Sequence, residues 1–211
     1  MPPSANRPPH GGKTPSAMSD TRRIGLFGGT FDPVHLGHLH LARVARESLG
    51  LDEVRFIPCR ISPHKLGSEP TPAAERLAML RLATRNEPWA VVDDLETLRA
   101  GPSYSWQTAR ETRERFPQAR LFWIMGTDQW EALPHWAHPE RLAECVEFIV
   151  FSRGAPAAPR NGYGLHAIHA DHPASATRIR EALANGENHL PWLDPEVEAH
   201  IRRLGLYRRA V

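Results

Sequence analysis

Three glycines, a threonine and two histidines lie close together in the segment GGTFDPVHLGH, which spans residues 28–38. Gly28 and Gly29 lack a Cβ atom, so the backbone can tighten there and a ligand can approach it closely. His35 and His38 are three residues apart and would share one face of a helix. The first turn of a helix attracts anions, and imidazoles can donate hydrogen bonds to phosphoryl oxygens. The segment therefore predicts a phosphate-binding site.

The neighbouring residues place this segment between a strand and a helix. The apolar run 24–27 is typical of a strand, residues 39–49 are expected to form a helix, and Asp32-Pro33 is a turn and helix-entry signal. Further strands are expected over 54–58, 89–92, 121–125, 146–150 and 165–168, and further helices over 72–83, 105–116, 139–144, 176–184 and 195–204. This alternation predicts an α/β fold with a doubly wound, mostly parallel, Rossmann-like sheet, which binds ligands at the carboxyl ends of its strands.

Side chains suited to nucleotide binding follow the strand expected over 121–125. Gly126 would let a nucleotide approach the backbone, and Asp128 could accept hydrogen bonds from ribose hydroxyls. Trp136 offers a flat face to an aromatic base. The alternative is that Trp136 belongs to the core and that Asp128 caps a helix.

Three other segments carry candidate ligand-binding groups. His64 and Lys65 lie in a loop after the second expected strand, where they could reach phosphates or simply be solvated. Near the C-terminus, a serine and a threonine begin a helix that also carries Arg180, a candidate phosphate contact or a surface arginine. In the segment GPSYS, Ser103 or Ser105 is a candidate helix N-cap.

These segments together resemble the nicotinate-nucleotide adenylyltransferases of the nucleotidyltransferase α/β-phosphodiesterase superfamily. GGTFDPVHLGH resembles the (T/H)-x-G-H signature, and the resemblance covers almost all of residues 23–211 through five segments in the same order. This chain departs from the family pattern at Ser105, where threonine is more usual, and at Ala174, where isoleucine is usual.

The resemblance implies transfer of an adenylyl group from ATP, with Mg²⁺, to nicotinate mononucleotide. For ATP it implies contacts from Gly28, Gly29, Thr30, Phe31, His35, His38, Gly126, Asp128, Ser175, Thr177 and Arg180. For the mononucleotide it implies contacts from Thr30, His64, Lys65, Ser103, Tyr104, Ser105 and Trp136. The catalytic roles fall to His35, His38, Lys65 and Arg180, acting by alignment and charge neutralisation.

Composition bounds the remaining possibilities. The 211 residues carry a net charge of +2 without a concentrated basic stripe, so no nucleic-acid partner is expected. No apolar run approaches the ~20 residues that span a bilayer, and no signal peptide is recognisable, so we expect a cytoplasmic protein with no membrane partner. Residues 1–22 are rich in proline and are expected to form a disordered tail before an adenylyltransferase domain over 23–211. The two cysteines and the histidines at 166, 169 and 172 fit no metal-ligand pattern.

Three alternatives stay open. The chain could instead prefer nicotinamide mononucleotide, which differs from nicotinate mononucleotide only at one carboxylate. A pantetheine-phosphate adenylyltransferase is disfavoured because it is shorter and lacks the G-x-D…W segment that ends here at Trp136. A non-catalytic nucleotide sensor could share the fold. The sequence leaves open whether the chain is a monomer or a homo-oligomer.

Overall fold

One parallel sheet of six strands organises the computed structural model, which describes residues 21–63, 70–188 and 190–208. The strands are β1 (Arg23–Gly29), β2 (Glu53–Pro58), β3 (Ala90–Val92), β4 (Arg120–Gly126), β5 (Glu147–Ser152) and β6 (Leu165–His169). Their order is β3-β2-β1-β4-β5-β6, and every neighbouring pair is parallel. The strand order reverses between β1 and β4, and ligands bind at such a switch point in doubly wound sheets. The predicted fold class is confirmed.

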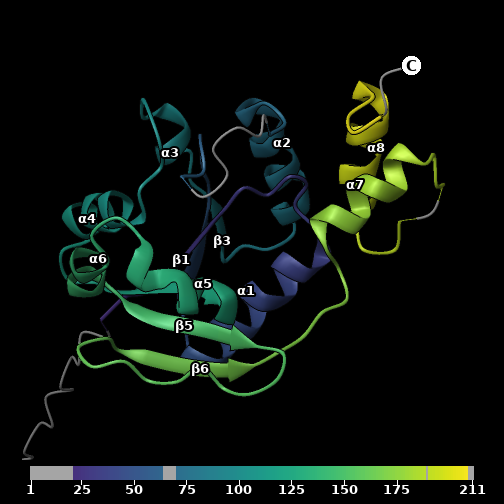
Figure 1. The fold of residues 1–211 in the computed structure, drawn as a ribbon. Coiled ribbons are helices and arrows are strands. Elements are labelled where there is room, and N and C mark those ends of the chain that lie inside the picture. Colours follow the sequence, from purple (N-terminus) through teal and green to yellow (C-terminus); the bar gives the residue numbers. More distant parts are fainter. Residues whose placement is uncertain (1–20, 64–69, 189, 209–211) are drawn as a thin grey trace, which may run out of the picture.

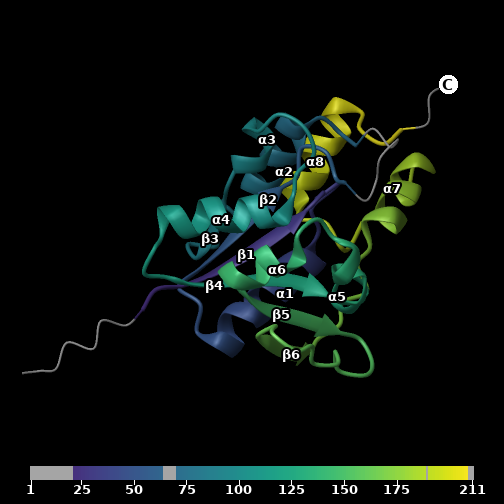
Figure 2. The same ribbon diagram turned by 60° about the vertical axis from the view of Figure 1, so that its left-hand side comes forward.

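Helices cover both faces of this sheet (Figure 1 and Figure 2). They are α1 (Leu36–Leu49), α2 (Ala73–Thr84), α3 (Leu95–Leu98), α4 (Ser105–Arg115), α5 (Thr127–Ala132), α6 (Pro139–Cys145), α7 (Ala176–Ala184) and α8 (Pro195–Leu204), with a 3₁₀ turn over Leu133–His135. One hydrophobic core lies between the sheet and α1, α2, α7 and α8. A second core lies on the opposite face, under α4, α5 and α6.

Strand β4 shows how the sequence builds this double-sided sheet. Trp123 and Met125 belong to one core, whereas Phe122 and Ile124 belong to the other, as the two-residue period of a strand requires. A strand that is covered on both faces reads as a continuous apolar run. Gly126 ends the run at the edge where ligands are expected.

The structure corrects three local predictions. Helix α1 begins at Leu36, and Asp32-Pro33 does not enter it, because the chain turns at Phe31 (φ 50°) and is still extended at His35. Helices α3 and α5 were not expected, since four and six residues are too short to show a helical apolar period. Arg22, assigned to the tail, forms an ion pair with Glu53 at 2.6 Å.

Some predictions fall outside the described residues. These include His64, Lys65 and residues 1–20 of the expected tail. Within the described ranges, no helix is long and apolar enough to cross a membrane.

Candidate active site

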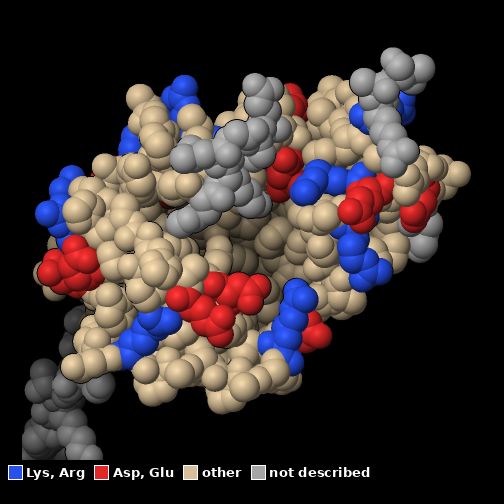
Figure 3. Space-filling view, viewed as in Figure 1, with Lys and Arg blue, Asp and Glu red and all other residues tan. Residues whose placement is uncertain are grey.

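A cavity of about 560 Å³ lies where β1 and β4 end, at the switch point of the sheet. Figure 3 shows a hollow on this face, with acidic side chains gathered along its lower edge. Of the predicted site residues, the cavity is lined by Gly28, Gly29, Thr30, Phe31, His38, Ser103, Ser105, Gly126, Asp128, Trp136 and Arg180. Its size is typical of sites for small organic ligands and cofactors.

Gly28 and Gly29, at the end of β1, pack closely against aromatic neighbours. A Cβ atom on Gly28 would lie 3.0 Å from the indole of Trp123, and one on Gly29 would lie 3.1 Å from the ring of Phe31. A larger residue at either position would have to displace Trp123 or Phe31 by a few tenths of an ångström, and with glycine there the bare backbone lines the cavity. The next residue, Thr30, is held by Arg76, which is 1% exposed and donates to the carbonyl oxygen of Thr30 at 2.8 Å.

His38 lines the cavity at the start of α1, and His35 supports it from behind. The two imidazoles stack with their centroids 3.6 Å apart and their planes 18° from parallel. His35 is buried and is not among the described residues that line the cavity. A phosphate contact through His38 is therefore directly available in this geometry, whereas a contact through His35 stays a prediction.

The hydrogen bonds of His38 determine which ring nitrogen can donate. The backbone N–H of His35 donates to Nδ1 of His38 at 3.2 Å. A neutral imidazole that accepts at Nδ1 carries its proton on Nε2, so His38 is an Nε2–H donor. Burial and the adjacent His35 ring lower the pKa of His38 well below its ordinary value. His38 can thus donate a hydrogen bond to an anionic oxygen without carrying a charge of its own.

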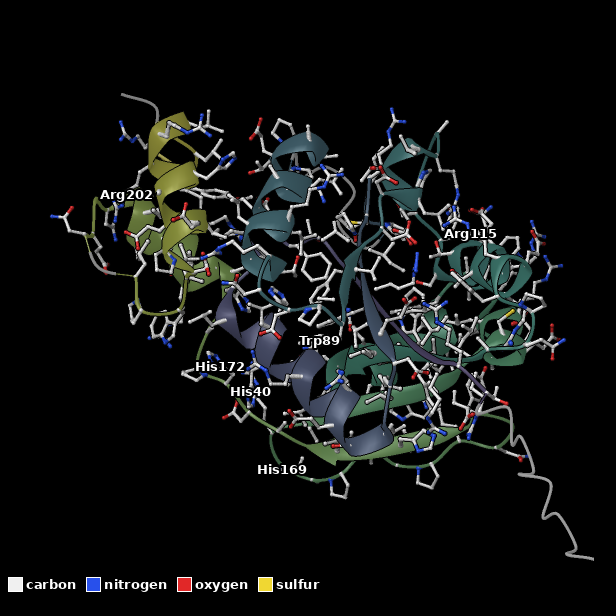
Figure 4. All side chains as sticks on the ribbon, turned by 180° about the vertical axis from the view of Figure 1, so that it is seen from behind. His40, Trp89, Arg115, His169, His172 and Arg202 are labelled. Carbon is white, nitrogen blue, oxygen red and sulfur yellow. The ribbon has the colours of Figure 1, made fainter. Side chains whose placement is uncertain are left out.

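A further pair of histidines lies behind this stack. A Cβ atom on Gly37 would lie 3.0 Å from Nδ1 of His35 and 3.1 Å from Nδ1 of His172, so a side chain at this position would require these rings to shift. The ring centroids of His172 and His40 lie 5.5 Å apart. Figure 4 labels both residues in the view from behind. Burial, and then the nearby His172 ring, lower the pKa of His35 to about 4. The stack is therefore neutral near pH 7.

The side of the cavity near α4 contains a buried acid that the sequence analysis missed. Glu96, at 4% exposure, lines the cavity and accepts a hydrogen bond from the hydroxyl of Thr108 at 2.6 Å. Burial raises the pKa of Glu96. Ser103 does not cap α4 as predicted: its Oγ accepts from the backbone N–H of Arg60 at 3.0 Å.

The N-cap residue of α4 is Tyr104, which has no side-chain capping bond, and the predicted cap Ser105 lies inside the helix. The serine cap could not be assigned from sequence here because Ser103 is held by Arg60 and Ile61, which follow β2. The backbone N–H of Ser103 donates to the carbonyl of Ile61 at 3.0 Å. Tyr104 is not among the described lining residues, whereas Ser105 is.

Helix α5 presents the predicted nucleotide-binding groups after β4. Gly126 is its N-cap residue, so Asp128 lies in the first turn and is not the cap. Gln129, which the sequence analysis missed, lines the cavity and accepts from the backbone N–H of Gly126 at 3.3 Å. Trp136 packs against the core under α5 and also lines the cavity, so both of its proposed roles are compatible.

Arg180 enters the cavity from α7. It donates to the backbone carbonyl of Asp32 at 2.7 Å and to the hydroxyl of Thr177 at 3.4 Å. Ser175 occupies the N-cap position of α7 but makes no side-chain capping bond. Ser175 and Thr177 are not among the described residues that line the cavity. Their predicted contacts with ATP stay predictions.

Comparisons with known proteins show the family of this chain. The sequence model of the cytidylyltransferase-like family matches residues 26–182. A probable nicotinate-nucleotide adenylyltransferase of Thermus thermophilus is 41% identical over 189 residues, which cover 88% of this chain and all of the relative. One from Neisseria meningitidis serogroup B is 36% identical and covers 89% of this chain and all of the relative.

Solved structures share the fold. Plasmodium falciparum nicotinic acid mononucleotide adenylyltransferase, in complexes with APC and with NaAD, superposes with a TM-score of 0.72 and covers 88% of this chain and 97% of that chain. At 18% and 19% identity this likeness supports the fold alone. On the sequence identity and coverage of its relatives, the chain belongs to the nicotinate-nucleotide adenylyltransferase family, within the cytidylyltransferase-like proteins.

Proposed function

We propose that this chain transfers the adenylyl group of ATP to nicotinate mononucleotide, giving deamido-NAD and pyrophosphate in NAD biosynthesis. One observation carries the proposal: a neutral Nε2–H donor on His38 and the guanidinium of Arg180 line the same cavity as the glycines at the end of β1. Donors of both kinds suit phosphate, and the cavity lies at the switch point of the sheet. The names of relatives at 36–41% identity support the same activity.

The chemistry requires no covalent intermediate with the enzyme. A phosphate oxygen of the mononucleotide forms a bond to the α-phosphorus of ATP, and the bond from that phosphorus to the α,β-bridging oxygen breaks. The electron pair leaves with pyrophosphate, so negative charge builds on the leaving group. Because the attacking oxygen is already anionic, no general base is needed. Catalysis then consists of alignment and stabilisation of the developing charge.

We assign the charge-stabilising roles to two described side chains. His38 donates from Nε2 to an oxygen near the α-phosphorus, and the absence of charge on its ring avoids repulsion within the histidine stack. Arg180 provides a formal positive charge beside the same turn, at a position fixed by its bond to the carbonyl of Asp32. Both donors are pre-oriented by protein contacts, which is how such groups stabilise a transition state efficiently.

We propose that Mg²⁺ enters bound to ATP. Among the described residues, no group of three or more His, Cys, Asp or Glu side chains is arranged to hold a metal ion. Asp128 lines the cavity and could supply a single oxygen ligand, whereas the carboxylate of Asp32, which also lines it, already accepts from Tyr207 and Thr71. Mg²⁺ commonly keeps its waters and binds through phosphates plus one or two carboxylates, so this donor set fits the metal–nucleotide complex. The ion would neutralise phosphate charge there.

We assign the pyridine end of the mononucleotide to the region between α3, α4 and α5. Trp136 offers a ring face, and Ser103 and Ser105 offer hydroxyls near the first turn of α4. A free N–H of that helix turn together with a serine hydroxyl would favour a carboxylate over an amide. This is the basis for proposing the nicotinate substrate over its nicotinamide counterpart.

The test is identification of the product. Purified protein is incubated with MgATP and nicotinate mononucleotide, and the mixture is analysed by chromatography and mass spectrometry for deamido-NAD. Equal amounts of deamido-NAD and pyrophosphate are expected. Binding of ATP without any dinucleotide product would instead indicate a nucleotide sensor and would refute the proposed enzyme. His135→Ala, which changes an exposed histidine outside the cavity lining, is a matched control for His38→Ala.

A further inference from the structure

The segment after α8 contacts the GGTFDP turn through the side chain of Tyr207. Helix α8 ends in left-handed backbone at Gly205, and Tyr207 (φ 63°) is left-handed as well. The hydroxyl of Tyr207 then donates to Oδ1 of Asp32 at 2.5 Å, across 175 residues of sequence. Asp32 lies in the GGTFDP turn and lines the cavity. The segment after α8 is thus connected directly to the candidate active site.

Asp32 joins three separate elements at this point. Its Oδ2 accepts from the backbone N–H of Thr71, just before α2, at 3.2 Å. Its backbone carbonyl accepts from Nη1 of Arg180, on α7, at 2.7 Å. Tyr207 supplies the third connection, from the segment after α8. A change in the orientation of Asp32 would therefore alter the carbonyl that positions Arg180.

The backbone of Tyr207 suggests that this contact has a role beyond packing. Left-handed backbone is uncommon for residues other than glycine, asparagine and aspartate. Such conformations persist where surrounding contacts hold them, and they cluster at functional sites. Burial and the hydrogen bond to Asp32 raise the pKa of Tyr207, so its phenol stays protonated and remains a donor. The donor keeps the carboxylate of Asp32 bonded within the protein, in a cavity that we expect to receive phosphates.

We propose that Tyr207 is a positioning residue for the triphosphate of ATP, which it serves by fixing Asp32 and, through the carbonyl of Asp32, Arg180. The proposal rests on the proposed adenylyl transfer, since it assigns Arg180 to a phosphate. Tyr207 touches no reacting atom in this account. Its effect should appear in ATP binding and leave the binding of the mononucleotide unchanged.

The test compares Tyr207→Phe, which removes only the hydroxyl, with the wild type in steady-state pyrophosphate release. The KM for ATP should rise about tenfold, the scale of losing part of a hydrogen bond to a charged group. The KM for nicotinate mononucleotide should stay within twofold. The matched control is Tyr163→Phe, because Tyr163 packs between Trp130 and Phe148 and is not among the described residues that line the cavity.

A double-mutant comparison separates positioning from general stability. On an Arg180→Lys background, Tyr207→Phe should add less than twofold to the KM for ATP, because the two side chains act through one path. A Tyr207→Phe variant that melts earlier but keeps its KM for ATP would overturn the proposal. If the wild type makes no dinucleotide, the proposed function fails, and calorimetric titration with MgATP still decides the role of Tyr207. Equal ATP affinity of wild type and variant would then refute it.

Discussion

Acidification should destabilise this protein through the histidine stack. His35 has a pKa of about 4 in the folded chain, against an ordinary value of 6.5, because it is buried and lies beside His172. Between these two values the unfolded chain takes up a proton that the folded chain rejects. Stability is therefore full above the unfolded value and is lost as the pH falls toward the folded one. His38, whose pKa is also lowered, acts in the same direction.

The expected size follows from linkage. On lowering the pH from 7 to 5, His35 alone should remove about 2 kcal/mol from the free energy of unfolding. Over the same pH range, the free energy of unfolding of the His35→Asn variant should fall by about 2 kcal/mol less than that of the wild type. Asparagine is favoured at the N-cap position that His35 occupies, so the start of α1 should be retained. The exposed His135 provides the matched control, His135→Asn, which should behave like the wild type.

The assay is urea unfolding of the three proteins at a series of pH values, followed by circular dichroism. NMR titration of histidine-labelled wild type gives an independent reading, in which the His35 ring should stay neutral until well below pH 6. Parallel stability curves for wild type and His35→Asn between pH 7 and 5 would refute the reasoning. So would a His35 ring that titrates at its ordinary value.

Three further predictions follow from the cavity. His38→Ala should lower kcat at least ~100-fold with an unchanged circular dichroism spectrum, the scale of losing one transition-state donor; a near-normal kcat in pyrophosphate release would exclude the donor role. Trp136→Ala should raise the KM for nicotinate mononucleotide roughly 2- to 10-fold, the size of one aromatic contact, and leave the KM for ATP unchanged. Equal rises in both KM values would contradict the assignment of Trp136 to the pyridine ring. Because the pKa of Glu96 is raised, its ionisation disfavours the folded state, so the stability of wild type relative to Glu96→Gln should fall as the pH rises above the ordinary value of Glu96. Urea midpoints at several pH values would measure this difference, and a pH-independent difference would contradict the reasoning.

Much of the scaffold could be predicted because local patterns dictate it. The apolar run of β4 indicates a strand covered on both faces, and α7 and α8 have the bounds that their periodicity and flanking residues predict. The alternation of strands and helices then leaves few topologies, since crossovers between parallel strands are right-handed. Helix α1 begins at Leu36, three residues before the predicted start at 39, and the Asp32-Pro33 helix-entry signal forms a turn outside the helix.

The parts of the site that could not be predicted depend on contacts far apart in sequence. Spacing placed His35 and His38 on one face, but only the fold shows that His35 is buried behind His38 and that His172 lies beside it. Glu96 and Tyr207 belong to no motif considered in the sequence analysis. Their burial and their partners depend on how α3 and the C-terminal segment meet the cavity.

The most direct test of the proposed activity is pyrophosphate release measured side by side with different acceptors. Purified protein receives MgATP with nicotinate mononucleotide, nicotinamide mononucleotide or pantetheine phosphate in separate reactions. The account predicts release that is fastest with nicotinate mononucleotide and depends on His38. Equal or faster release with nicotinamide mononucleotide would contradict the assigned pyridine pocket, and release with pantetheine phosphate alone, or with none of the three, would contradict the central claim.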